Sequence, residues 1–275
     1  MKKLLESGGI KKAISIALTF AVIQALISTN IISAYLQDTL TTICINIILA
    51  VSLNLITGFT GQFSLGHAGF MSIGAYVCAF ITLRMPTTAG FILGVFAGAA
   101  AAAMVGCIVG LPTLRLRGDY LAIATLGMSE IIRIIFLNLK ITNGAAGLNG
   151  IPQFVNWGWL FVFTVGTVLV ITNFLKSSHG RACISIREDE IAAEAMGVNT
   201  TKYKVVAFTV GAFCAGIAGA VYASYFYFLE PNLFGFLKSV DVLVIVVLGG
   251  LGSVSGSVLA AILLAVVSTI LQSFS

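Results

Sequence analysis

The sequence predicts an all-α polytopic membrane protein with about eight transmembrane helices, or nine if its last apolar region forms two, and with glycine-broken segments. Three observations lead to this prediction. Hydrophobic residues make up 59% of the chain and charged residues 9%, whereas soluble domains average about 25% charged residues. The mean hydropathy is +1.06. The 29 glycines fit membrane helices, where glycine lets backbones approach closely. We expect a single membrane domain over residues 1–275.

Apolar runs mark the expected spans in chain order, because a helix needs about 20 apolar residues to cross a bilayer. The first run is too long for the core of a secretory signal, so it predicts an uncleaved span. The last run is too long for one untilted helix and is broken at Gly249–Gly256, so either one span is interrupted there or two spans meet. The runs cover residues 13–35, 40–57, 67–83, 89–111, 120–137, 157–175, 204–228 and 240–272.

The basic residues predict the orientation of the spans, because cytoplasmic loops carry an excess of Lys and Arg. With a cytoplasmic N-terminus, three basic residues fall outside (Arg84, Lys140 and Lys238), and Arg133 lies within a span. All the others fall inside, which supports this orientation: Lys2, Lys3, Lys11, Lys12, Arg115, Arg117, Lys176, Arg181, Arg187, Lys202 and Lys204.

The run 89–111 contains small residues spaced by four, which places them on one stripe of a helix. Such a stripe allows tight helix packing, either within this chain or against another subunit. The stripe consists of Gly94, Gly98, Ala102, Gly106 and Gly110.

Residues 177–203 form the one sizeable polar stretch between spans. Within it we expect a short helix over Arg187–Met196, with acids in its first turn, where the helix dipole favours them, and Gly197 at its C-terminal cap. The stretch is either a handle that a partner grips or a solvated connector. Its length exceeds that of most connections, which favours a function.

Motifs for catalysis, nucleotide binding and metal binding are missing from the sequence. There is no Gly-Lys dipeptide and hence no P-loop, and neither a zinc-protease helix motif nor a Gly-x-Ser-x-Gly elbow occurs. The five cysteines include no Cys-x-x-Cys pair. We therefore expect a chain that is not an enzyme, has no catalytic or metal-binding residues and holds no cofactor. The net charge of +5 comes from basic residues at the ends of spans and does not indicate nucleic-acid binding.

Several polar residues and glycines at membrane depth are candidates for a translocation path. Irregular backbone is tolerated at this depth only where protein or a cavity satisfies it. Either these breaks line the path, or they are packed structural breaks with His67 hydrogen-bonded to a neighbouring helix. The two breaks could be equivalents in two internal halves. The candidates are Gln62, Ser64 and His67 in the first break, and Gly249, Gly250 and Gly252 in the second.

Charged pairs are expected near or within the spans, and one is an interfacial pair of Asp119 with the neighbouring Arg115 and Arg117. Glu130 and Arg133 lie three residues apart in one span, so they share a helix face and can pair. A neutralised buried pair is the interpretation we favour, because ionisable residues in spans usually face the bundle interior or a cavity. Lys238 and Asp241 are expected to form an interfacial pair on the outer side.

Four segments of the sequence resemble the branched-chain amino-acid ABC transporter permeases, and the LivM-type subunit in particular. The similar segments occur in family order and cover most of residues 50–270. They are Asn54–Tyr76 (NLITGFTGQFSLGHAGFMSIGAY), Leu116–Gly127 (LRGDYLAIATLG) followed by Gly147–Pro152, Ile186–Gly197 (IREDEIAAEAMG) and Gly249–Gly256.

The resemblance implies a subunit of an importer in a bacterial or archaeal cytoplasmic membrane, surrounded by lipid. A second, LivH-type permease would complete the membrane path, two cytoplasmic ATPases would use ATP and Mg²⁺, and an external binding protein would deliver branched-chain or related hydrophobic amino acids. ATPase closure would move the polar segment and produce alternating access.

The resemblance also implies that the polar segment docks into an ATPase. ABC importers carry Glu-Ala-Ala-x-x-x-Gly here, but in this chain Ile191 stands at the Glu position and Glu190 comes one residue earlier. The expected coupling residues are Arg187, Glu188, Asp189, Glu190, Ala192, Ala193, Glu194 and Gly197.

Two other functions compete with the importer. A secondary transporter driven by an ion gradient would need an intramembrane carboxylate, and Glu130 is the candidate, although Arg133 can neutralise it. If the chain were a purely structural subunit, the polar segment and the glycine breaks would have no function, which disfavours this alternative.

Overall fold

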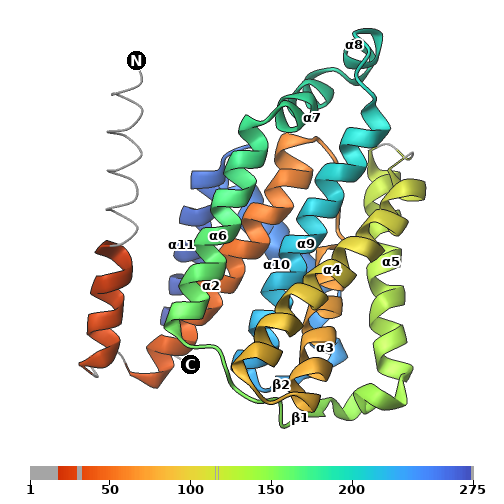
Figure 1. Ribbon diagram of the computed structural model, residues 1–275. Coiled ribbons are helices and arrows are strands. Elements are labelled where there is room, and N and C mark those ends of the chain that lie inside the picture. The colour runs from red at the N-terminus through yellow and green to blue at the C-terminus, as the bar shows by residue number, and fades with distance from the viewer. Residues whose placement is uncertain (1–17, 30–32, 115, 117, 274–275) are drawn as a thin grey trace. The chain divides into compact units, whose positions relative to one another are not determined.

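The computed structural model describes residues 18–29, 33–114, 116 and 118–273, most of them helical (Figure 1). Contacts divide the chain into two compact units, residues 1–42 and 43–275. The first unit contains a short apolar helix, Leu18–Ser28, and the beginning of α2 (Ala34–Asn54). The described part of the expected span 13–35 is therefore not one helix, because the first helix ends at Ser28 and α2 begins at Ala34. Lys2, Lys3, Lys11, Lys12, Arg115 and Arg117 lie outside the described residues.

The second unit is a helical bundle with two short strands. A π-helix, η1 (Leu55–Phe59), continues α2, and short 3₁₀ turns follow α5 and precede α10. The remaining elements are α3 (His67–Arg84), α4 (Thr88–Thr113), α5 (Asp119–Asn138), η2 (Lys140–Thr142), η3 (Gly144–Ala146), β1 (Leu148–Asn149), α6 (Trp157–Lys176), α7 (Ser178–Glu188), α8 (Glu190–Ala195), α9 (Thr200–Phe226), β2 (Phe228–Leu229), η4 (Pro231–Phe234), α10 (Phe236–Gly249) and α11 (Val254–Ser273).

Seven stretches of the described helices are long and apolar enough to cross a membrane, which confirms the polytopic all-α class. The count is close to the predicted eight or nine. The helix α3 is not among the seven, since His67 and Arg84 stand at its two ends. Most of its residues are nevertheless buried inside the bundle, as expected for a central helix.

The last apolar region is two helices, so the second of the two predicted alternatives is correct. The helix α10 ends at Gly249, and α11 begins at Val254. Gly250 and Gly252 have φ values of 91° and 83°, a left-handed conformation that glycine adopts without strain. Ser253 Oγ then accepts a hydrogen bond from the Gly256 N–H at 3.1 Å and so starts the next helix.

The core forms where α3, α4 and α9 pack against one another. The small-residue stripe of α4 lies in this packing: a Cβ on Gly98 would be 2.7 Å from the Gly74 carbonyl of α3, and one on Gly106 would be 2.6 Å from Ala212 of α9. Gly216 of α9 faces the same stripe, with Ala102 as its neighbour. The stripe therefore serves packing within this chain, the first of its two predicted alternatives.

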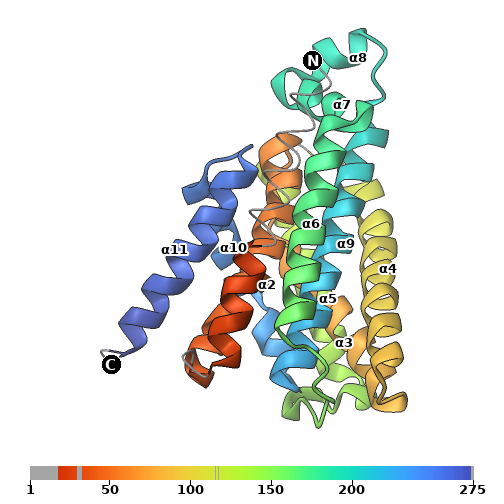
Figure 2. The ribbon, with the colours of Figure 1, turned by 60° about the vertical axis from the view of Figure 1, so that its left-hand side comes forward.

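Different elements occupy the two ends of the second unit (Figures 1 and 2). The helices α7 and α8 lie at one end. At the other end β1 and β2 pair antiparallel, with Leu148 opposite Leu229, and join the loops after α5 and α9. The helix α9 runs from the α7 end to the end with the strands, and α10 runs back. The break after α10 therefore lies at the α7 end (Figure 2).

Candidate functional site

The two glycine-rich breaks predicted from the sequence meet at the side chain of Asn54, the last residue of α2. Its Nδ2 donates to Ser257 Oγ at 2.7 Å and to the Ser253 carbonyl at 3.0 Å. Its Oδ1 accepts from the Gly252 N–H at 2.9 Å. One buried amide thus satisfies backbone groups that the break between α10 and α11 leaves without helical partners.

Glycines are required where the breaks touch. A Cβ on Gly58 in η1 would overlap the Asn54 side chain and the Gly252 backbone nitrogen. Gly252 also has a positive φ and lies against Arg187, whose Nη1 would be 2.5 Å from a Cβ at that position. Any larger side chain at these two positions would separate the breaks.

Arg187, at the C-terminal end of α7, joins this meeting point to the polar segment. Its Nη1 donates to the Gly58 carbonyl at 2.8 Å, and its side chain packs against Gly61, where a Cβ would be 3.4 Å from Arg187 Cγ. Its Nε lies 3.8 Å from Glu188 Oε1. Of the predicted coupling residues, Arg187 is thus in direct contact with the predicted path.

The first break, residues 60–66, carries the predicted path residues Gln62 and Ser64 and ends at His67. All three side chains are buried. His67 Nε2 lies 2.8 Å from Ser52 Oγ of α2, as the packed-break alternative predicts, and Ser64 Oγ accepts from the Gly66 N–H at 3.4 Å. Both polar atoms of the Gln62 side chain have no hydrogen-bond partner in the part of the chain that the structure describes. Their role in transport stays a prediction.

Neighbouring helices satisfy the backbone of this break, as membrane depth requires. The Leu65 N–H donates to Thr125 Oγ1 of α5 at 3.1 Å, and the Ala68 N–H donates to Ser239 Oγ of α10 at 3.2 Å. The break is therefore held between α5 and α10.

A cavity of about 700 Å³ lies beside the second break. Gly252, Ser253 and Ser255 line one side, and Val168 and Thr172 of α6 line another. Of the predicted path residues, Gly252 is thus next to open space, whereas Gly249 packs against Gly256, whose carbonyl carbon would be 2.6 Å from a Cβ on Gly249.

The predicted helix Arg187–Met196 is wrong in its bounds. The structure has α7 from Ser178 to Glu188 and a separate α8 from Glu190 to Ala195. The physical reason is Asp189, whose Oδ1 accepts from the N–H groups of Ile191 and Ala192 at 2.9 and 3.0 Å. Aspartate favours this capping position over a helix interior, so the acids end one helix and start another.

The end of α8 follows the prediction. Gly197 has a φ of 83°, and the Val198 N–H bonds the Ala193 carbonyl at 3.0 Å, a closing pattern that favours glycine. Glu190 Oε1 pairs with Lys204 Nζ of α9 at 2.7 Å. The predicted coupling residues are therefore attached to the bundle at both ends of the segment, through Arg187 and Glu190.

The inner face of α7 is packed and the outer face of α8 is open. Burial raises the pKa of the Cys183 thiol to about 11, although a hydrogen bond with Thr60 opposes this shift. In contrast, Ile191 is 74% exposed and Met196 is 84% exposed. Both side chains lie on a segment outside the spans, Ile191 within α8 and Met196 directly after it; we call these two exposed apolar residues the α8 face.

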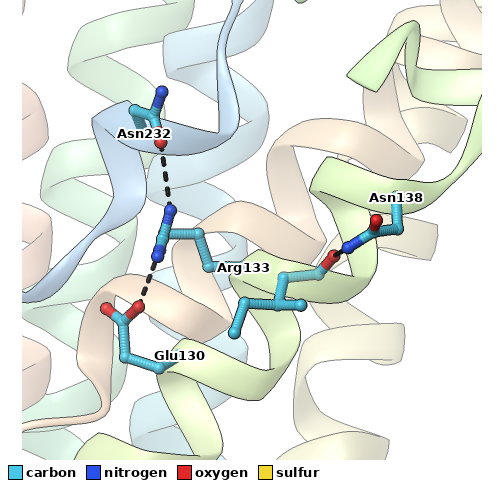
Figure 3. A network of polar contacts seen from close by, with 5 residues as sticks. Glu130, Arg133, Asn138 and Asn232 are labelled. Atoms are coloured by element: carbon cyan, nitrogen blue, oxygen red, sulfur yellow. Dashed lines mark hydrogen bonds and ion pairs between the residues drawn. The ribbon is translucent and has the colours of Figure 1, made fainter. Parts of the chain in front are cut away.

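The predicted intramembrane pair is present: Arg133 Nε lies 2.7 Å from Glu130 Oε2 (Figure 3). Arg133 Nη1 also donates to Asn232 Oδ1 of η4 at 3.0 Å. Lys238 and Asp241, predicted to form an interfacial pair, lie one turn apart at the start of α10 and attract each other electrostatically. Lys238 Nζ also contacts Asn46 Oδ1 of α2 at 3.4 Å, and the place of the pair at the membrane interface stays a prediction.

Sequence reasoning missed Asn54, Asn46 and Asn232, which join segments far apart in the chain. Asn46 and Asn54 were detectable as amides inside an otherwise apolar run, where an amide must find partners. Their partners follow only from the tertiary structure, since they lie about 190 or more residues away.

Residues 35–275 match a family model described as the permease component of the branched-chain amino acid transport system. The high-affinity branched-chain amino acid transport system permease protein LivM of Salmonella typhimurium is 37% identical, and the protein of that name from Escherichia coli K12 is 38% identical; each comparison covers 86% of this chain and 64% of the relative. The Salmonella typhimurium permease protein LivH is 24% identical over 82% of each chain. No solved structure matches. The chain spans just under two thirds of its LivM relatives, and it belongs to the branched-chain amino acid transport permease family.

Proposed function

We propose that this chain is a membrane-spanning permease subunit of an ATP-driven ABC importer for branched-chain or related hydrophobic amino acids. The family membership and the seven candidate spans support this proposal. The observation that carries the coupling to ATP is the hydrogen bond between Arg187 and the Gly58 carbonyl. It joins a segment outside the spans to a break within them.

The proposal includes partners that supply what this chain lacks. Similarity to both LivM and LivH relatives supports a second, LivH-type permease in the complex. Two cytoplasmic ATPases would bind ATP and Mg²⁺, and an extracytoplasmic binding protein would deliver the substrate. The complex would lie in a bacterial or archaeal cytoplasmic membrane, with the N-terminus of this chain in the cytoplasm. This chain would act as a transport subunit without enzyme activity and without binding nucleic acid.

The α8 face is the proposed contact for an ATPase. Large apolar side chains that stay exposed outside the membrane mark protein contacts. Ile191 lies on a helix that Asp189 caps and that the Glu190–Lys204 pair ties to α9, and Met196 follows this helix directly. A partner that moves α8 would therefore move the top of α9 and the end of α7 with it.

The coupling path then follows from the contacts of Arg187. Motion of α7 pulls on Gly58 in η1, and the Asn54 amide transmits the motion to the break between α10 and α11. Rigid movement of helices around these breaks would open the path alternately to the two sides.

The ion-driven alternative is weaker. Glu130 is paired with Arg133 at 2.7 Å, so its charge is already balanced within the span. The relatives are transport-system permeases, which favours the importer.

Purification of the complex with altered α8 faces tests the proposal. Replacing Ile191 with Glu puts a charge on the α8 face, so the ATPases should no longer co-purify, and ATP-driven uptake should be lost. The matched control is Ile141→Glu, because Ile141 is 70% exposed in η2 at the opposite end. Full ATPase recovery with both Ile191→Glu and Met196→Glu would contradict the proposed contact.

A further inference from the structure

The charged residues inside the spans gather around one cavity. We leave out the first and last five residues of each described span. The charged residues that then remain inside the spans are Glu130 and Arg133 of α5 and Lys238 and Asp241 of α10. All of them line a cavity of about 360 Å³. A charged side chain inside a span costs free energy, so such residues mark substrate or ion pathways. Their concentration around one cavity indicates a site for a charged ligand.

One side of the cavity holds a fixed guanidinium. Arg133 is held between Glu130 and Asn232 (Figure 3), and Asn232 Nδ2 in turn donates to Glu230 Oε1 at 2.7 Å. Arginine has five N–H donors in a planar fork. These contacts engage its Nε and Nη1, so donors remain for a carboxylate group in the cavity.

The beginning of α10 adds to the positive side. Gly235 precedes α10 and provides no side-chain cap for the first N–H groups, and a Cβ at this position would be 3.7 Å from Arg133 Cδ. The N-terminus of a helix that begins within a span favours an anionic group. Lys238, in the first turn of α10, brings an ammonium whose one hydrogen bond among the described residues is the 3.4 Å contact with Asn46.

Asp241 provides the opposite charge. It follows Lys238 by three residues, so the two share a face of α10. Its carboxylate attracts the Lys238 ammonium electrostatically, and within the part of the chain described by the structure no hydrogen bond or closer ion pair engages it. The cavity therefore combines donors for an anion with an acceptor for a cation, and its formal charges sum to zero.

The remaining lining is apolar. Leu233, Phe236 and Leu237 complete the wall, and Leu237 is 75% exposed. The volume lies near the lower end of the roughly 300–1,000 Å³ range of small-molecule sites. A small molecule with one positive group, one negative group and an apolar tail matches this lining.

We propose that this cavity binds the zwitterionic head group of a hydrophobic α-amino acid during transport. The carboxylate lies toward Arg133, Lys238 and the start of α10, the ammonium lies toward Asp241, and the aliphatic side chain contacts Phe236 and Leu237. This assignment rests on the proposed function and gives it a site in this chain.

Uptake kinetics of the complete complex in proteoliposomes test the site, with leucine as the probe. Lys238→Gln and Asp241→Asn should each raise the KM for leucine by roughly tenfold to a hundredfold, the value of a lost charge-assisted hydrogen bond. The matched controls are Lys140→Gln and Asp119→Asn, which remove the same charges near the two ends of α5 from residues that do not line the cavity. An unchanged KM in both cavity variants would overturn the assignment.

A second measurement keeps the test valid if those variants fail to fold. Leu237→Cys places a thiol in the cavity wall, and Ile141→Cys places one on an exposed turn outside it. Leucine should slow the reaction of a charged thiol reagent at position 237 and not at position 141. Equal rates with and without leucine at both positions would overturn the site.

The two proposals fail in different ways. If the unaltered complex takes up no hydrophobic amino acid with ATP, the proposed function is wrong, and this site falls with it. If the complex takes up leucine but neither the cavity variants nor the protection assay responds, the site alone is wrong.

Discussion

At the scale of single residues, the proposed function depends on a few polar side chains that connect distant segments. Asn54 joins the two breaks, and Arg187 joins them to α7. Buried polar groups of this kind stabilise one arrangement, since their partners lose hydrogen bonds when either side moves.

Replacing Asn54 with Ala should destabilise the protein by about 1–3 kcal/mol for each partner left unsatisfied. The partners are the Gly252 N–H, the Ser253 carbonyl and the Ser257 hydroxyl. Thermal unfolding of the purified protein in detergent measures the change. The control is Asn138→Ala, because Asn138 is exposed and bonds only within its own helix, to the Ile134 carbonyl at 2.8 Å. Equal melting temperatures for the two variants would refute the account of Asn54.

Replacing Arg187 with Ala should uncouple ATP hydrolysis from transport. Without the bond to the Gly58 carbonyl, motion of α7 no longer pulls on η1, so uptake should fall by about tenfold or more while ATP hydrolysis changes by less than about twofold. Parallel assays of uptake and phosphate release in proteoliposomes measure both quantities.

Arg181→Ala is the control for this uncoupling, because Arg181 bonds the Lys176 carbonyl within its own region at 3.2 Å. If Arg187→Ala lowers both activities in proportion, Arg187 supports assembly and not transmission.

Many of these residues were recognisable in the sequence, but their connections were not. A break was predictable at Gly58–His67 because glycines interrupt an apolar run there, and a pair was predictable at Glu130 and Arg133 from their spacing. The spacing also placed Lys238 and Asp241 on one face of a helix, but it did not reveal the contact of Lys238 with Asn46 of α2, because that partner lies 192 residues away in the chain.

At the scale of secondary-structure elements, close packing of α3, α4 and α9 sets the frame around which the breaks are arranged. In these contacts glycines lie against the backbone of a neighbouring helix: a Cβ on Gly74 would overlap the Gly216 backbone, and one on Gly219 would overlap the Met71 carbonyl. Backbones this close gain dispersion contacts in a membrane, where no hydrophobic effect drives helices together.

Gly74→Ala should therefore destabilise the bundle by about 1–3 kcal/mol, the usual effect of overpacking. Gly166→Ala is the matched control, because Gly166 lies within α6 and no neighbouring atom comes within 4 Å of the place that its Cβ would occupy. That variant should be neutral or up to about 1 kcal/mol more stable, since alanine favours helices. Melting temperatures in detergent distinguish the two, and a Gly74→Ala variant as stable as the control would contradict the packing.

The positions of helices were predictable from hydropathy, and their caps less so. The junction of α10 and α11 was anticipated at Gly249–Gly256 but left undecided, because glycine is compatible with both an interrupted and a completed helix. The split of α7 from α8 was missed, since an acid-rich sequence such as Arg187–Glu190 suits the first turn of a helix and a capping position equally.

At the scale of the whole molecule, the sequence was sufficient to predict a polytopic helical protein, because length, hydropathy and scarce charge leave few other classes. The functional arrangement was not predictable in this way. The two breaks and the charged cavity come from residues separated by up to about 200 positions in the chain, and only their packing in the bundle shows which of them lie together.

The source of energy for transport tests the central claim most directly. Leucine uptake should be measured in proteoliposomes that hold this chain with its permease, ATPase and binding-protein partners, first with ATP and then with an imposed proton or sodium gradient. We predict uptake that requires ATP and the binding protein and is indifferent to the gradient. Gradient-driven uptake by this chain alone, without ATP or partners, would contradict the account.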